Sequence, residues 1–144
     1  FVFLVLVFTQ IIIGAFVSGM DAGKIYNSWP LMGYSYFPND NDFKSLFELS
    51  ALSDPSLVQF IHRNLAYFIG IYYLFMFYKI YKNKMYDLYK SVNILGCLII
   101  IQIILGIFTI LYGAQIYIAS MHQISSIFLV SSCVYFLYIN TRFN

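Results

Sequence analysis

The two histidines of this chain, His62 and His122, each lie a short way into a long apolar segment. An ionisable side chain inside a membrane span is costly to desolvate, so such a residue is a candidate for function and for pairing with a partner. Two imidazoles at one depth on neighbouring helices could supply both axial ligands of a haem iron. The pattern is compatible with a six-coordinate haem that has His62 and His122 as metal ligands. The alternative is that both histidines form hydrogen bonds within the bundle in another role.

Small residues surround both histidines. His62, Ala66 and Gly70 repeat at i, i+4 and i+8, which places them on one helix face. Small residues also follow or precede His122 on its own face, namely Ala119, Ser125 and Ser126. They would leave room for a flat macrocycle, although small residues also let helices pack closely.

Three polar side chains lie near the level of the histidines, and a fourth lies deeper. Arg63 could pair with a haem propionate or reach a lipid phosphate. Gln59 and Gln123 could hydrogen-bond propionates or each other, so both are candidate cofactor-binding residues together with Arg63. Gln102 lies deeper and is predicted to bond across helices, which contributes about 0.6 to 2 kcal/mol.

Other site chemistries fit the sequence less well. A tetrahedral zinc site needs three or four ligands, and the chain has two histidines at this depth. We find no Ser-His-Asp or Cys-His arrangement, and the predicted spans contain no Asp or Glu. Because ligating histidines would leave the pocket poor in general acids and bases, we assign no catalytic residue and expect a cofactor holder.

The segments that carry these residues read as membrane spans. Hydrophobic residues make up 61% of the 144 residues and charged residues 10%, far from the roughly 25% charged residues of a soluble domain. Stretches long enough to cross a bilayer at about 1.5 Å per residue cover residues 1–19, 57–80, 92–112 and 116–139. The predicted fold is an all-α membrane protein, a four-helix antiparallel transmembrane bundle that forms one domain over residues 1–144.

The connectors predict the orientation. Residues 79–90 carry four lysines against one aspartate, whereas residues 21–56 carry five acidic residues against two lysines. By the positive-inside rule the first connector and both termini face the inside, and the haem site lies toward the outer side. The long outer loop, residues 20–56, is expected to carry a short amphipathic helix over residues 43–52. Asp54-Pro55 is expected to cap and begin the second span.

The two cysteines form no predicted site, and the first segment shows no cleavable leader. Cys97 and Cys133 lie inside predicted spans, where small apolar packing is their expected role. The first apolar run lacks the features of a cleavable signal peptide, and the chain opens on Phe1 rather than Met, so we expect a fragment of a longer protein.

Four motifs in order along the chain resemble haem A synthases of the mitochondrial and alphaproteobacterial type. They are the loop Gly19–Gly33 (GMDAGKIYNSWPLMG), Gln59–Arg63 followed by Ala66-Tyr67, Gln102-x-x-Leu105-Gly106-Ile107-x-Thr109, and Ala119-x-x-His122-Gln123. The resemblance implies an eight-span oxidoreductase, built as two similar four-helix halves, that oxidises the methyl group of haem O to the formyl group of haem A.

This chain resembles the second half of that family. The resemblance implies that His62 and His122 hold a haem b cofactor and that the haem O substrate is bound in the N-terminal half. In that first half a glutamate stands three residues before the first histidine, whereas Gln59 stands in the equivalent place here. Some relatives carry a cysteine pair in outer loops, and this chain has no cysteine there.

The expected localisation is the bacterial inner (plasma) membrane or the mitochondrial inner membrane. Besides the lipid bilayer and haem O, expected partners are haem O synthase and a second copy of the chain, and no nucleic acid. The alternative function is a bis-histidine transmembrane cytochrome b that only relays electrons. A third hypothesis is a haem-free structural or transport protein.

Overall fold

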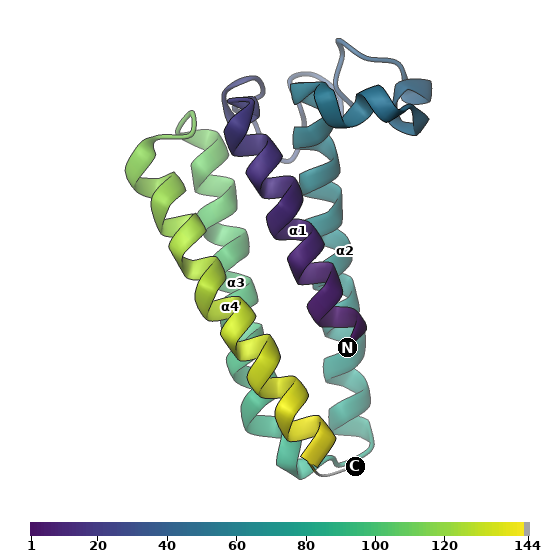
Figure 1. Cartoon of the computed structure of the whole chain (residues 1–144), viewed down its shortest axis with the longest axis vertical. Helices are drawn as coiled ribbons and strands as arrows, with labels where there is room; N and C mark the ends of the chain where they lie inside the picture. Colours follow the sequence, from purple (N-terminus) through teal and green to yellow (C-terminus); the bar gives the residue numbers. More distant parts are fainter. Residues whose placement is uncertain (143–144) are drawn as a thin grey trace.

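Four long helices make up the fold of the computed structural model, which describes residues 1–142 (Figure 1). They are α1 (Val2–Gly19), α2 (Pro55–Lys82), α3 (Tyr86–Leu111) and α4 (Ile116–Arg142). The all-α architecture and the four predicted helices are therefore present. The last two residues of the predicted domain, 143 and 144, lie outside the described residues.

Three of the described helices, α1, α3 and α4, are long and apolar enough to cross a membrane. Many of their large apolar side chains are exposed in the bundle, as hydrocarbon-facing residues must be. Helix α2 is as long but more polar, because Gln59, His62, Arg63 and Asn64 interrupt its apolar run. The chain is a membrane protein, and α2 as its fourth span stays a prediction.

Two helix starts are explained by the local sequence. Pro55 opens α2, and the Asp54 carboxylate accepts a hydrogen bond of 2.9 Å from the Leu57 amide, which is the predicted N-cap. Helix α3 begins at Tyr86, six residues before the predicted span, and takes Asp87 into its first turn. Apolarity marks only the part of a helix that fits hydrocarbon, whereas backbone hydrogen bonding continues beyond it.

The predicted amphipathic helix over residues 43–52 is wrong. The segment forms two short 3₁₀ helices, Phe43–Phe47 and Leu49–Ser53, on either side of Glu48. Glu48 has extended backbone angles (φ −92°, ψ 150°), which break the helical hydrogen-bond ladder. Both short helices project sideways from the bundle, away from α1, α3 and α4 (Figure 1).

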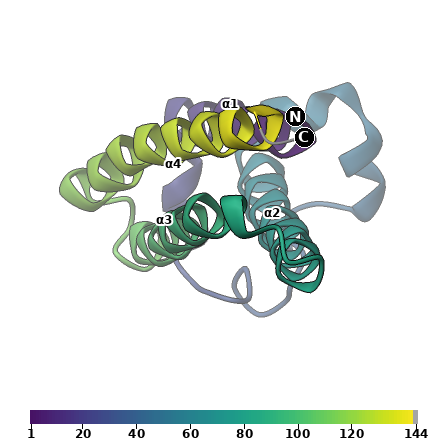
Figure 2. The ribbon, with the colours of Figure 1, turned by 90° about the horizontal axis from the view of Figure 1, so that it is seen from below.

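The four helices form two hairpins, α1–α2 and α3–α4, whose members pack most closely with each other. Seen end-on in Figure 2, the hairpins lie side by side and enclose one interior. Buried apolar residues from all four helices fill this interior below the level of the histidines: Phe3, Val7, Ile69, Leu95, Ile99, Leu129 and Cys133. Cys97 is exposed, and both thiols are free.

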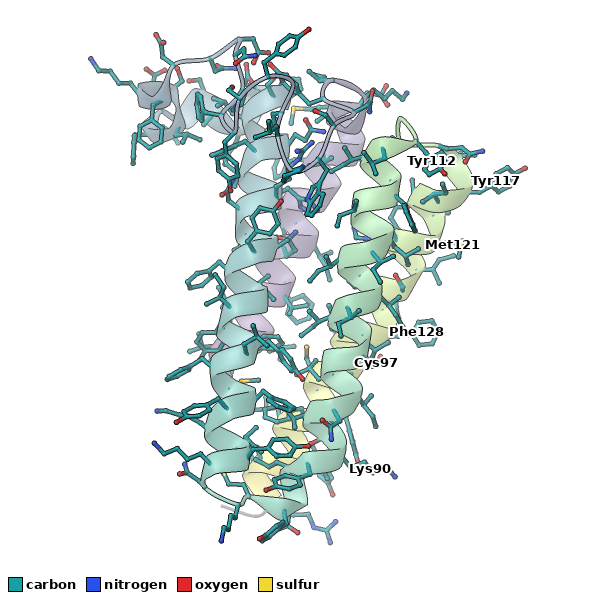
Figure 3. The ribbon with its side chains drawn as sticks, turned by 180° about the vertical axis from the view of Figure 1, so that it is seen from behind. Lys90, Cys97, Tyr112, Tyr117, Met121 and Phe128 are labelled. Carbon is teal, nitrogen blue, oxygen red and sulfur yellow. The ribbon has the colours of Figure 1, made fainter. Side chains whose placement is uncertain are left out.

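The two connector ends of the bundle are chemically distinct. Figure 3 places Lys90 near the α2–α3 connector, and Tyr112 and Tyr117 near the opposite end. The start of α1 and the end of α4 lie toward the end of the bundle that holds the α2–α3 connector (Figure 1). The arrangement agrees with the predicted antiparallel topology, and its orientation in a membrane stays a prediction.

Helices α2 and α3 approach closely at Gly96. A Cβ placed there would lie 2.0 Å from the Tyr73 hydroxyl oxygen, which donates a hydrogen bond of 3.2 Å to the Val92 carbonyl. Gly96→Ala is therefore expected to separate the helices and destabilise the bundle by about 1–3 kcal/mol. Thermal unfolding in detergent checks this, with Gly19→Ala as the control because a Cβ at Gly19 meets nothing within 4 Å. Equal unfolding temperatures for the two variants would contradict the prediction.

Candidate functional site

His62 lies on α2 with its ring against α1. The Gln10 side-chain Nε2 is 3.2 Å from each of the two ring nitrogens of His62 and donates a 3.1 Å hydrogen bond to the His62 carbonyl. One turn farther along α1, Gly14 leaves space for the ring, since a Cβ there would lie 3.1 Å from the His62 Cε1. The ring is thus held in a cradle that α1 provides.

His122 lies on α4 with its ring against α3 in the same way. The Gln102 Nε2 donates to the His122 carbonyl at 3.3 Å and to the Ser125 hydroxyl at 2.7 Å. A Cβ on Gly106 would lie 3.2 Å from the His122 Cε1. The prediction that Gln102 bonds across helices is confirmed.

Both histidines lie at matched depths. His62 is the eighth residue of α2 and His122 the seventh of α4, about 10 Å and 9 Å along helices that run in the same direction. Met121, directly before His122, points away from the bundle (Figure 3). These facts place the histidines at one depth on different hairpins.

Arg63 and Gln59 are buried beneath the outer connector. The Arg63 guanidinium donates to the Leu31 carbonyl at 3.2 Å and to the Tyr26 carbonyl at 3.1 Å. The Gln59 Nε2 donates to the same Tyr26 carbonyl at 3.0 Å. Since Arg63 is only 6% exposed, the alternative of reaching a lipid phosphate does not fit its position.

Gln123 lies apart from this cluster. Its side chain is exposed and its Nε2 donates to the Ser18 hydroxyl of α1 at 3.5 Å. The predicted contact between Gln59 and Gln123 is not formed, because Gln59 bonds the connector. Gln123 instead joins the two hairpins near the level of His122.

The outer connector is fastened to the end of α2 by side-chain hydrogen bonds. The Asp40 carboxylate accepts from the Ser56 hydroxyl at 2.6 Å and from the Tyr26 hydroxyl at 2.9 Å. Although burial alone raises it, these bonds hold the pKa of Asp40 below its ordinary value. The ionised carboxylate therefore stabilises the connector at neutral pH and loses this contribution as the pH falls through its lowered pKa. The Trp29 Nε1 also donates to the Tyr67 hydroxyl at 2.8 Å.

Buried polar atoms without a partner gather at this site. Within residues 1–142 they are Gln10 Oε1, Gln59 Oε1, Arg63 Nε, His122 Nδ1 and, away from the site, Ser132 Oγ. A buried polar group without a hydrogen bond is rare in folded proteins and calls for an explanation such as a ligand. Four of these five atoms belong to residues on or beside the two histidines.

Open space borders α2 inward of His62. A Cβ on Gly70, two turns inward from His62, would meet nothing within 4 Å. Among the described residues, no three His, Cys, Asp or Glu side chains gather to form a metal site. An iron held by two axial histidines needs no third protein ligand, because a porphyrin supplies the other four. The two imidazoles and the unpaired polar atoms beside them are a donor set that fits a haem.

Gln10 and Gly14 are site residues that lie outside the four sequence motifs. Residues 10–16 (QIIIGAF) and 102–108 (QIILGIF) are identical at five of seven positions. This internal similarity pairs Gln10 with Gln102 and Gly14 with Gly106. It is a signal in the sequence that could have identified both residues.

Comparison with known proteins gives one family. The model of the family described as Cytochrome oxidase assembly protein (COX15-CtaA) matches residues 1–134. The chain is 43% identical over 137 residues to Heme A synthase of Pelagibacter ubique, which covers 95% of this chain and 40% of the relative.

Two other relatives carry the same printed name. Heme A synthase of Flavobacterium johnsoniae is 38% identical over 135 residues, covering 90% of this chain and 39% of the relative. Heme A synthase of Rickettsia prowazekii is 38% identical over 137 residues, covering 94% of this chain and 41% of the relative. The chain thus spans about two fifths of the length of the curated relatives it matches. No solved structure matches.

Proposed function

The chain belongs to the Cytochrome oxidase assembly protein family, and from this premise we propose that it is the haem b-binding half of a haem A synthase. The complete enzyme is an oxidoreductase that converts the methyl group of haem O to the formyl group of haem A for cytochrome oxidase. Relatives named Heme A synthase that align with 90–95% of this chain support the proposal.

The observation that carries the proposal is the set of unpaired buried polar atoms around two matched histidines. A haem b bound there supplies one-electron redox chemistry. His62 and His122, on different hairpins, would hold the iron, and Gly14 and Gly106 let each histidine ring lie against its neighbouring helix. Gly70 leaves open space on α2 that a side chain would fill.

Arg63 supplies a charge that needs a partner. Its guanidinium is buried, bonds only backbone carbonyls and has an unpaired Nε, and no carboxylate pairs with it among residues 1–142. A buried charge without a counter-charge is strongly unfavourable. We infer that a haem propionate provides this counter-charge, with the unpaired Gln59 Oε1 and the more distant Gln123 at the edge of the site.

The half described here holds an electron carrier rather than the substrate. Gln59 cannot titrate, and α2 (Pro55–Lys82) contains no Asp or Glu. General acid or base work on a methyl group needs a titratable side chain near the reacting carbon. We therefore place haem O in the other half of an eight-span protein and assign no catalytic residue to this chain.

The membrane placement follows from the same proposal. We place the chain in the inner membrane of a bacterium or a mitochondrion, with α2 as the fourth span and the lysine-rich connector and both termini inside. The haem site then lies toward the outer side, beneath the connector that Arg63 fastens. Haem O synthase, as the source of the substrate, and a second copy of the chain are the protein partners that this function predicts.

Haem A formation tests the proposal. The full-length protein, expressed with an enzyme that produces haem O, is expected to convert haem O to haem A, as measured by chromatography of extracted haems. His62→Ala should abolish the conversion because the electron acceptor is lost. The electron-relay alternative predicts a haem b spectrum without any haem A, and that result would overturn the synthase proposal.

A further inference from the structure

We propose that Gln10 is a positioning residue for the His62 ring, and that the two axial histidines are therefore unequal ligands. The proposal rests on the haem b site proposed above and adds a residue that no motif of the resemblance includes. The two hairpins share one arrangement of a glutamine, a glycine and a histidine.

Each hairpin repeats one arrangement. A glutamine on the first helix, Gln10 or Gln102, donates to the backbone carbonyl of the histidine on the second helix, at 3.1 Å and 3.3 Å. A glycine four residues later, Gly14 or Gly106, lies against the Cε1 of that histidine. Since α1 and α3 run in the same direction, the hairpins are parallel repeats around an axis along the bundle.

The two copies differ in what else the glutamine binds. Gln102 turns to the Ser125 hydroxyl, three residues after His122, at 2.7 Å. The position three residues after His62 is Leu65, which has no hydroxyl. The Gln10 amide consequently reaches the ring itself, 3.2 Å from each ring nitrogen. One residue, Ser125 or Leu65, decides whether the glutamine contacts its histidine ring.

The contact has a chemical consequence for a ligand histidine. A histidine that binds a metal through one nitrogen donates the N–H of the other to an acceptor, which fixes the ring and makes it a stronger ligand. The Gln10 Oε1 is buried and unpaired, and exchanging the places of Oε1 and Nε2 would give the ring an acceptor in return for the Nε2 bond to the His62 carbonyl. The His122 Nδ1 is buried with no partner among residues 1–142. His62 is therefore the stronger donor to the iron.

Redox titration of the full-length protein with its haem tests this. Gln10→Leu removes the acceptor and is expected to raise the midpoint potential of the haem, because a weaker ligand stabilises ferric iron less. Gln10→Glu supplies a stronger acceptor and is expected to lower the potential. The low-spin ferric resonance spectrum should change in both variants. A residue that only supports the fold would not move the potential in opposite directions.

Leu65 and Ser125 supply matched variants that leave Gln10 in place. Leu65→Ser offers the Gln10 amide a hydroxyl and should raise the potential, as Gln10→Leu does. Ser125→Leu frees Gln102 to reach the His122 ring and should lower it. These two variants decide the question if Gln10→Leu does not fold.

Unchanged potentials in Gln10→Glu and Ser125→Leu, or shifts of one sign in all four variants, would overturn the role of Gln10. That result is distinct from failure of the haem site itself. If the haem b spectrum survives His62→Ala, the proposed function fails. If the spectrum is lost in His62→Ala but the midpoint potential is unchanged by the Gln10 substitutions, only this inference is refuted.

Discussion

Replacing either histidine with alanine should eliminate the haem b spectrum of the full-length protein. Both rings are needed because the proposed iron takes one ligand from α2 and one from α4, and no third metal-binding side chain lies with them in residues 1–142. The expected result for His62→Ala and for His122→Ala is loss of the reduced-minus-oxidised signal from purified protein, with the protein still present in the membrane.

A matched control is available one residue away. Met121 adjoins His122 in sequence but points out of the bundle (Figure 3), so Met121→Ala should keep the full spectrum. A wild-type spectrum in either histidine variant would remove that residue from the ligand set. Loss of signal in Met121→Ala as well would indicate a general folding defect instead of ligand loss.

Arg63→Leu should release the outer connector from the bundle. The substitution removes one of two donors to the Leu31 carbonyl, which keeps the Ser28 hydroxyl, and one of two donors to the Tyr26 carbonyl, which keeps the Gln59 Nε2. A hydrogen bond contributes about 0.5–1.5 kcal/mol net, so losing both Arg63 bonds costs about 1–3 kcal/mol. When the connector opens and closes rapidly, the rate of proteolysis follows the open population, and about 1.4 kcal/mol changes that population tenfold.

Trypsin cleavage after Lys24 measures this release. Lys24 lies in the connector and its side chain is 57% exposed. Cleavage in membrane vesicles should be about 5- to 100-fold faster in Arg63→Leu than in the wild type, by the same arithmetic. Gln59→Leu removes one hydrogen bond and should have a smaller effect. Identical cleavage rates in Arg63→Leu and the wild type would show that Arg63 does not hold the connector.

Much of the helical fold was predictable because membrane helices are long and apolar. The positions of α1, α2 and α4 follow from the hydropathy of the chain and from the Asp54-Pro55 cap, within a few residues. The start of α3 was missed because Tyr86 to Ser91 is polar yet helical. Apolarity shows which residues favour transfer into hydrocarbon, whereas a helix extends as far as its backbone N–H and C=O groups hydrogen-bond to each other.

The connector was much less predictable. Residues 43–52 have apolar side chains at helical spacing, but Glu48 is extended and divides the segment into two 3₁₀ helices. Short helices gain little from spacing alone, because a short segment has few backbone hydrogen bonds to offset nucleation. The carbonyl partners of Arg63 were equally hidden, since they come from a loop 32 and 37 residues away along the chain.

For the site, amino-acid type and spacing were enough to select His62 and His122. Few groups can stand in hydrocarbon without a functional partner, and helical rise converts their positions into equal depth. The role of Gln10 depended on the folded bundle. Its partner is 52 residues away, and the Gln10 amide contacts both the ring and the backbone carbonyl of His62. Depth is a property of each helix alone, whereas contacts across helices exist only once the helices pack.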